Sequence, residues 1–132
     1  MALINRPIIP KQPKIKNTQL IKWYRSNHKQ CEVCALDGIT AIADDLHHIL
    51  SNYNRSDLLW NIIMLCRNHH IQATEHINPI SGRKLNIVLF AIKFLKNEIG
   101  TNTLLELDIY FEVMLAVNMI EKQFEQYKKG TI

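Results

Sequence analysis

The spacing of hydrophobic residues predicts helices toward both ends of the chain. Asn17 or Thr18 can cap a short helix that runs to about Ser26 and carries apolar and aromatic residues on one side. Between residues 85 and 95, apolar positions recur at three- and four-residue steps, which predicts a helix with one apolar face that stops near Gly100. That face consists of Leu85, Val88, Leu89, Ile92 and Leu95.

Residues 103–127 carry two competing patterns. Apolar residues keep helical spacing from Val113 onward, and Thr103 with Glu106 resembles a capping box. Residues 105–113 also alternate between apolar and polar types, which is the pattern of a strand. Because no turn residue interrupts the segment, we predict one long helix rather than a strand followed by a helix. Apolar side chains around much of this helix make a homodimer through the C-terminal helices plausible.

The middle of the chain predicts a small sheet and a helix. Residues 39–49 are rich in β-forming types and predict a hairpin around residues 43–45, with His47 and His48 on its second strand or just after it. Residues 56–60 predict a turn, and Ile62–Leu65 suits a short buried strand. A helix is expected from residue 67 or 68 to about residue 76, and Gly82 is expected to end this region. The predicted fold class is therefore α+β.

Length and composition predict one domain in the cytoplasm. The chain has 132 residues, of which 47% are hydrophobic and 21% charged, as is usual for a globular protein. No apolar run is long enough to cross a bilayer, and the first residues lack the apolar core of a signal peptide. We expect a basic arm at residues 1–16, a single domain at residues 17–132, and no contact with a membrane.

Charge is unevenly distributed along the chain. Residues 1–30 hold seven basic side chains and no acidic one, residues 31–82 carry a net charge of −4, and the remainder is close to neutral. A basic arm beside an acidic centre that binds metal fits a polyanionic substrate such as DNA. The candidate DNA contacts are Arg6, Lys11, Lys14 and Lys16. The alternative is an extended, solvated tail, because Pro7, Pro10 and Pro13 punctuate the same stretch.

Cysteine spacing predicts a structural zinc site. Cys31 and Cys34 form one pair three residues apart, and Cys66 and His69 form a second. Two such half-sites together supply the four sulfur and nitrogen ligands of a tetrahedral zinc. Three cysteines are an odd number, which also favours metal over disulfides in a reducing compartment. The alternative for the fourth ligand is His70.

The central third of the chain resembles the HNH endonuclease family. That family's ββα-metal motif runs Cys-x-x-Cys, then Asp/His-His-Ile, then Asn, then Leu-Cys-x-x-Cys-His. The matching pieces are Cys31-Glu-Val-Cys34, Asp45-Leu-His47-His48-Ile49, Asn61, and Leu65-Cys66-Arg-Asn-His69-His70. The sequence departs from the family at His69, where a fourth cysteine is usual, and at Ser51, where many members have proline.

The resemblance implies a fold and a set of roles. It implies a small ββα-metal core at about residues 31–76 with a structural Zn²⁺, to which the hydrophobic spacing of the later residues adds a helical part at residues 83–129. His47 and His70 would hold Mg²⁺ or another divalent ion, with coordination positions left open. His48 would act as the general base, since a neutral imidazole can accept a proton from water. Asn61 would secure the loop that orients this base, and Asp45 is a further candidate neighbour.

These roles predict a metal-dependent endonuclease that hydrolyses DNA phosphodiester bonds. Two other classes of function remain open from the sequence. One is a nucleic-acid-binding module, stabilised by zinc, that does not cleave. The other is a protein-interaction adaptor, which dimerisation of the apolar C-terminal helices without affinity for DNA would support. Separately, His47 and His48 could be a polar pair beside a metal knuckle without a catalytic role.

Overall fold

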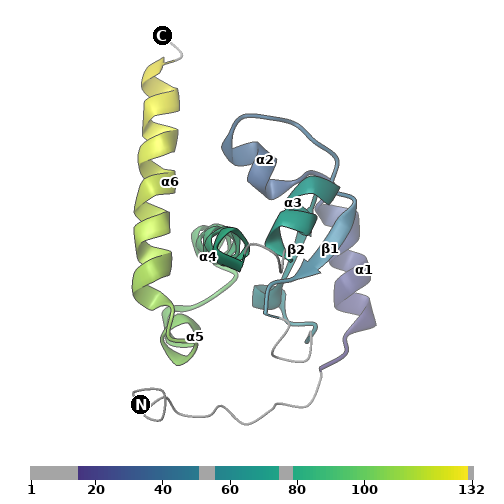
Figure 1. Cartoon of the computed structure of the whole chain (residues 1–132). Helices are drawn as coiled ribbons and strands as arrows, with labels where there is room; N and C mark the ends of the chain where they lie inside the picture. The colour runs from purple at the N-terminus through teal and green to yellow at the C-terminus, as the bar shows by residue number, and fades with distance from the viewer. Residues whose placement is uncertain (1–14, 51–55, 75–78, 131–132) are drawn as a thin grey trace.

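The computed structural model describes residues 15–50, 56–74 and 79–130, and it confirms the α+β class. The chain alternates short elements in its first half and is helical in its second half (Figure 1). In order, the elements are α1 (Thr18–Asn27), α2 (Glu32–Leu36), β1 (Asp45–His48), the 3₁₀ turn η3 (Leu59–Asn61), β2 (Ile62–Leu65), α3 (Arg67–Ala73), α4 (Pro79–Leu95), α5 (Thr101–Glu106) and α6 (Tyr110–Gly130).

The strands and α3 form a ββα unit at the centre of the molecule. β1 pairs antiparallel with β2, with Asp45 opposite Leu65 and His48 opposite Ile62. All four residues of β2 are buried, as the sequence predicts. The helix α3 follows β2 after one residue, Cys66, and packs against both strands. The ββα unit therefore carries the paired histidines and the second half-site, Cys66 and His69, and the preceding helix α2 carries the first half-site.

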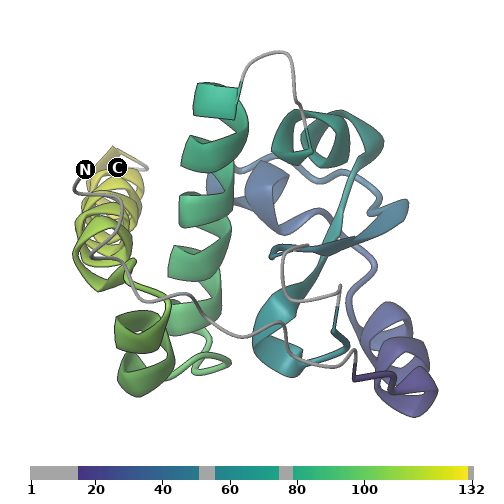
Figure 2. The ribbon, with the colours of Figure 1, turned by 60° about the horizontal axis from the view of Figure 1, so that its bottom comes forward.

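Side-chain alternation along β2 divides the core into two parts. Ile62 and Met64 face a small cluster with Tyr24 of α1, whereas Ile63 and Leu65 face the larger core against α4. Figure 2 shows α4 between the ββα unit and α6. The helix α4 therefore contacts elements on both sides and joins them in the larger core. A strand buried on both faces explains why its sequence is continuously apolar.

The helix α1 agrees with its prediction. Asn17 caps it, with its side-chain Oδ1 accepting a hydrogen bond from the backbone N–H of Leu20 at 3.0 Å. Tyr24 is fully buried, and Leu20 and Ile21 pack beside it. The apolar side of α1 that the sequence predicts thus covers one face of the hairpin.

The prediction of a hairpin that turns around residues 43–45 is wrong. Ile42 makes only an isolated bridge with Gln30, and the backbone N–H of Ala43 donates to Lys29. β1 pairs instead with β2, so His47 and His48 lie on the first strand of the hairpin. Local β-forming residues predicted a strand correctly, but its partner is set by packing of β2 in the core.

The prediction of a single helix at residues 103–127 is also wrong, and so is the alternative of a strand followed by a helix. α5 ends at Glu106, and α6 begins at Tyr110 after Asp108 adopts a left-handed conformation with φ of 60°. Aspartate tolerates this conformation better than most residues, so a break here needs no glycine. Thr103 lies inside α5, whose N-cap is Gly100, so the expected capping box does not form.

The bounds of the α3 and α4 helices differ from their predictions. α3 ends at Ala73, and residue 76 lies outside the described residues. α4 begins at Pro79 and contains Gly82, so that glycine does not end the preceding region. α4 stops at Leu95, where Asn97 with φ of 60° reverses the chain before Gly100. None of the helices in the described ranges has the length and hydropathy needed to cross a membrane.

Candidate functional site

The four residues predicted to bind zinc come together at the first turns of α2 and α3. Cys31 and Cys66 are the N-cap residues of these helices, and Cys34 and His69 each follow three positions later. One turn of helix therefore brings the two members of each pair to the same side. All four ligand atoms lie within 4.8 Å of one another. His69, rather than His70, completes this group.

The distances within the group fit a tetrahedral ion. Nδ1 of His69 lies 3.4 Å, 3.5 Å and 3.3 Å from the sulfurs of Cys31, Cys34 and Cys66, and the last two sulfurs are 3.9 Å apart. Ligands around one zinc, at the usual bond lengths of about 2.0 to 2.3 Å, are roughly 3.5 to 3.8 Å apart. The Cys₃His group could therefore hold a zinc ion.

Electrostatics at the cysteines favour a bound cation. Burial alone would raise the pKa of Cys31, but backbone N–H groups of Cys66 and Cys34 donate to its sulfur and lower the pKa to about 7. The pKa of Cys34 is raised to about 12, first by burial and then by its contacts with Cys31. Thiolates this close would repel one another, so a divalent cation bound among them would allow all of them to ionise.

Hydrogen bonds fix the tautomer of His47, which lies on β1 and is 4% exposed. Its Nε2 is 3.0 Å from Oδ1 of Asn86 on α4. The amide nitrogen of Asn86 donates to the carbonyl of Ala73 at 3.2 Å, so its oxygen must accept and Nε2 of His47 must carry the proton. Nδ1 of His47 is then an unprotonated nitrogen. Burial lowers the pKa of His47 to about 4, which keeps the ring neutral at pH 7.

His70 on α3 is oriented by Asp45. Nδ1 of His70 donates to Oδ2 of Asp45 at 3.0 Å, and Arg67 contacts the other carboxylate oxygen at 3.4 Å. The hydrogen bond from His70, followed by the contact with Arg67, lowers the pKa of Asp45. Nε2 of His70 remains for a further partner. A carboxylate behind an imidazole is a common support of histidines that bind metals.

His47 and His70 lie side by side on the face of the hairpin that α3 covers. Their ring centres are 5.2 Å apart, and the ring planes are inclined at 63°. Two imidazoles that share one ion, at nitrogen-to-metal distances of about 2.1 Å, place their ring centres roughly 4.5 to 5.2 Å apart. The structure thus brings these two predicted ligands together, with one nitrogen of each left after its hydrogen bond.

His48 points to the opposite face of β1, as alternation along a strand requires. Its Nε2 donates to Oδ1 of Asp57 at 2.9 Å, and its side chain is 23% exposed. Asp57 is buried and also accepts a hydrogen bond from the backbone N–H of Asn17 at 2.8 Å. The carboxylate holds the imidazole in one orientation and leaves Nδ1 of His48 as its proton acceptor.

Asn61 joins the two ends of the segment between β1 and η3. It is fully buried, and its Oδ1 accepts the backbone N–H of Leu50 at 2.8 Å. Its Nδ2 donates to the carbonyl of Ser56 at 3.1 Å. These contacts tie the backbone just after His48 to the backbone just before Asp57. Asn61 therefore acts on the surroundings of His48 through the main chain.

Sequence reasoning missed Asn86 and treated Asp57 only as a turn residue. Asn86 and Lys93 are the polar positions in the otherwise apolar stretch 85–95, and this exception to the pattern is a signal that could have identified Asn86. No comparable spacing marks Asp57, because its contact with His48 depends on tertiary structure rather than on a local sequence pattern. Of the predicted DNA contacts, Arg6, Lys11 and Lys14 lie outside the described residues, and Lys16 is exposed.

Comparison with known proteins identifies no significant match to this chain. No family model matches the chain, and no curated protein or solved structure matches it significantly. The resemblance to HNH endonucleases therefore rests on the residues and spacings of this chain alone.

Proposed function

We propose that the protein is a metal-dependent endonuclease of HNH type that hydrolyses DNA phosphodiester bonds on a scaffold stabilised by zinc. The observation that carries the proposal is the pair of His47 and His70, whose rings lie 5.2 Å apart beside the Cys₃His group. Asn86 and Asp45 each occupy one nitrogen of these rings. Such support is expected where two imidazoles present their remaining nitrogens to an ion.

The residues would divide the chemistry among them. His47 and His70 would hold Mg²⁺ or another divalent ion, which offsets charge on the phosphate and on the leaving oxygen. His48 would accept the proton of the attacking water at Nδ1, and Asp57 would keep the ring oriented and stabilise its charged form. Asn61 would hold the main chain on either side of this pair.

Charge supports a nucleic-acid substrate. The first 30 residues carry seven basic side chains without an acidic one, and the isoelectric point of the chain is about 9.0. Phosphate contacts from such a stretch give binding that weakens steeply with salt. We therefore propose DNA as the partner, with the basic arm supplying affinity rather than base recognition.

Nicking of supercoiled plasmid by the full chain, loaded with zinc, tests the proposal. Wild type should nick the plasmid when Mg²⁺ or Mn²⁺ is added, and His48→Ala should be slower by about a hundredfold or more. His28→Ala is a matched control, because His28 lies outside the site and contacts Tyr24. Zinc content and thermal unfolding of each variant show that the scaffold is intact. Failure of wild type to nick, with full zinc content, would exclude the nuclease.

A binding module without cleavage is the second candidate function. It is favoured by the position of His48, which is bonded to Asp57 on the opposite face of β1 from His47. In this case wild type and His48→Ala would bind DNA equally, with affinity that falls as salt rises, and neither would nick the plasmid. The same preparation, tested by filter binding and by nicking, separates the two functions.

A further inference from the structure

The long helix α6 is apolar on two opposite sides. One side packs in the core through Val113, Val117 and Ile120, which are at most 5% exposed. The other carries Phe111, Leu115 and Met119, which are 80%, 67% and 72% exposed. We call these three residues the outer stripe.

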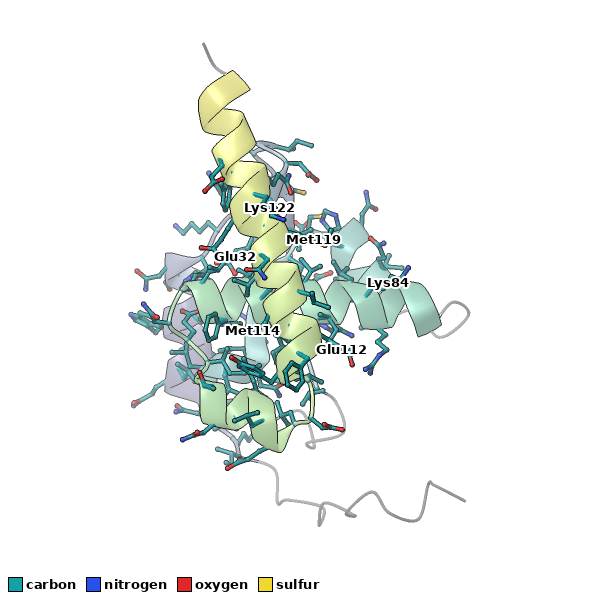
Figure 3. All side chains as sticks on the ribbon, turned by 90° about the vertical axis from the view of Figure 1, so that its left-hand side faces the viewer. Glu32, Lys84, Glu112, Met114, Met119 and Lys122 are labelled. Atoms are coloured by element: carbon teal, nitrogen blue, oxygen red, sulfur yellow. The ribbon has the colours of Figure 1, made fainter. Side chains whose placement is uncertain are left out.

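Helix geometry places the outer stripe away from the rest of the molecule. Steps of four residues advance about 40° beyond a full turn, so the three side chains form one narrow row. The core-facing residues lie roughly 160° around the helix from this row. In Figure 1, α4 is seen nearly end-on at one side of α6, and the opposite side of α6 faces outward. Figure 3 looks onto this outward side, with Met119 and Lys122 labelled on it.

Surface helices of monomeric proteins usually have one apolar side, and contiguous exposed apolar patches mark interaction sites. Three large apolar side chains in one row, each more than half exposed, form such a patch. Charged groups lie along the same row and restrict its partner. Lys122 follows the outer stripe toward the C-terminus, and Glu112 flanks it near the start of α6.

We propose that the outer stripe binds the outer stripe of a second copy of this chain, with the two α6 helices antiparallel and Leu115 on the two-fold axis. In this register Phe111 of one copy meets Met119 of the other, so each large side chain has an apolar partner. The contact is self-complementary, as a two-fold dimer requires.

Charge selects the antiparallel arrangement. With Leu115 at the centre, the two Lys122 side chains lie at opposite ends of the contact, and Glu112 lies opposite Asn118. A parallel pair would instead place Lys122 against Lys122 and Glu112 against Glu112, which is unfavourable. Glu112 is already satisfied within its own chain, since Arg83 donates to both of its carboxylate oxygens. The antiparallel pair leaves that bridge in place.

The size of the outer stripe predicts a weak dimer. Its three side chains expose roughly 400 Å² per copy, which is below the area of about 800 Å² per partner in standard interfaces. We therefore expect a dissociation constant in the range of tens to hundreds of micromolar. The dimer does not depend on nuclease activity, so it can be tested separately from the proposed function.

Sedimentation velocity of the full chain with zinc, at concentrations from about 10 μM to about 1 mM, tests the proposal. Wild type should shift from monomer to dimer over this range, and Leu115→Glu should raise the dissociation constant at least about tenfold. Ile42→Glu is the matched control, because Ile42 is 76% exposed and lies outside the helices. A monomer at every concentration would overturn the proposal. A protein other than a second copy of this chain would then be the candidate partner of the outer stripe. Equal behaviour of the two variants would also overturn it.

Paired charges test the register. Phe111→Lys and Met119→Glu should each weaken the dimer, and the double variant should regain it, because each introduced lysine then faces an introduced glutamate of the other copy. The two positions are two turns apart in one helix, so they gain nothing from each other within a chain. A double variant weaker than either single variant would show a parallel pair and contradict the antiparallel register. Far-ultraviolet circular dichroism and zinc content confirm that every variant is folded.

Discussion

Nε2 of His47 on β1 donates a hydrogen bond to Oδ1 of Asn86 on α4, at 3.0 Å, across 39 positions of sequence. The amide of Asn86 is itself fixed, because its nitrogen donates to the carbonyl of Ala73 at the end of α3. Asn86 on α4 thus forms hydrogen bonds with both β1 and α3. Its effect is to select which nitrogen of His47 is free.

Replacing Asn86 should disturb His47 without unfolding the protein. We expect Asn86→Ala to weaken Mn²⁺ binding by about tenfold to a hundredfold, because the ring loses its fixed tautomer and orientation. Asn86→Asp should retain most of the affinity, since a carboxylate oxygen also accepts from Nε2. Calorimetric titration of the protein with zinc already bound measures this affinity, and ¹⁵N chemical shifts of His47 report the tautomer.

The control for Asn86 is Asn102→Ala, which removes an exposed asparagine at the start of α5. It should leave both the affinity and the ¹⁵N shifts unchanged. A wild-type His47 protonated at Nδ1 would contradict the tautomer assignment, whatever the outcome of the nuclease assay.

Replacing Asp57 should affect cleavage more than metal binding. Asp57→Asn removes the charge that orients His48 and stabilises its protonated form, so nicking should slow by about a hundredfold or more. Mn²⁺ affinity should stay within about twofold, because Asp57 contacts His48 rather than the His47 and His70 pair. Asp44→Asn, at an exposed aspartate, is the matched control. Equal loss of affinity and nicking would argue that Asp57 only maintains the fold.

Asn61→Ala should destabilise the protein. Asn61 is fully buried, and its side chain bonds the backbone at Leu50 and Ser56, so its removal leaves buried polar groups without partners. We expect a loss of about 2 to 3 kcal/mol in the free energy of unfolding, measured with urea. Asn102→Ala, at an exposed position of α5, should change it by less than about 0.5 kcal/mol. A similar small change for Asn61→Ala would refute the role given to its hydrogen bonds.

The fourth zinc ligand can be exchanged. His69→Cys places a thiolate where nitrogen now lies near three sulfurs, so it should retain one zinc per chain. His69→Ala should bind zinc at least about tenfold more weakly and unfold at a lower temperature, because zinc stabilises the folded state by binding to it. Elemental analysis after dialysis and a thermal melt measure both effects. Full zinc retention by His69→Ala would show that another residue is the ligand.

Local patterns predicted the parts of the fold that local sequence determines. The cap at Asn17, the apolar face of α4 except for the exposed Leu95, and the buried strand β2 follow from residue types within a few positions of each other. The same holds for the Cys₃His group, because each half-site is a pair three residues apart at the start of a helix. Two short-range signals therefore predicted a site built from distant parts of the chain.

Contacts between distant residues account for the failures. Which strand β1 pairs with depends on burial of β2 between α1 and α4, and nothing in residues 39–49 encodes that. The break at Asp108 lets Leu104 of α5 and Val113 of α6 both reach the core, a requirement that helical spacing alone does not reveal. The partners of His47 and His48 were missed for the same reason.

Nicking of supercoiled plasmid by His70→Ala beside wild type, both shown to carry one zinc per chain, tests the central claim most directly. His70 is next to His69 in sequence, but its ring pairs with His47 rather than with the cysteines. The account predicts that wild type nicks the plasmid in Mn²⁺ and that His70→Ala, with its zinc retained, does not. Nicking by His70→Ala at the wild-type rate would contradict it.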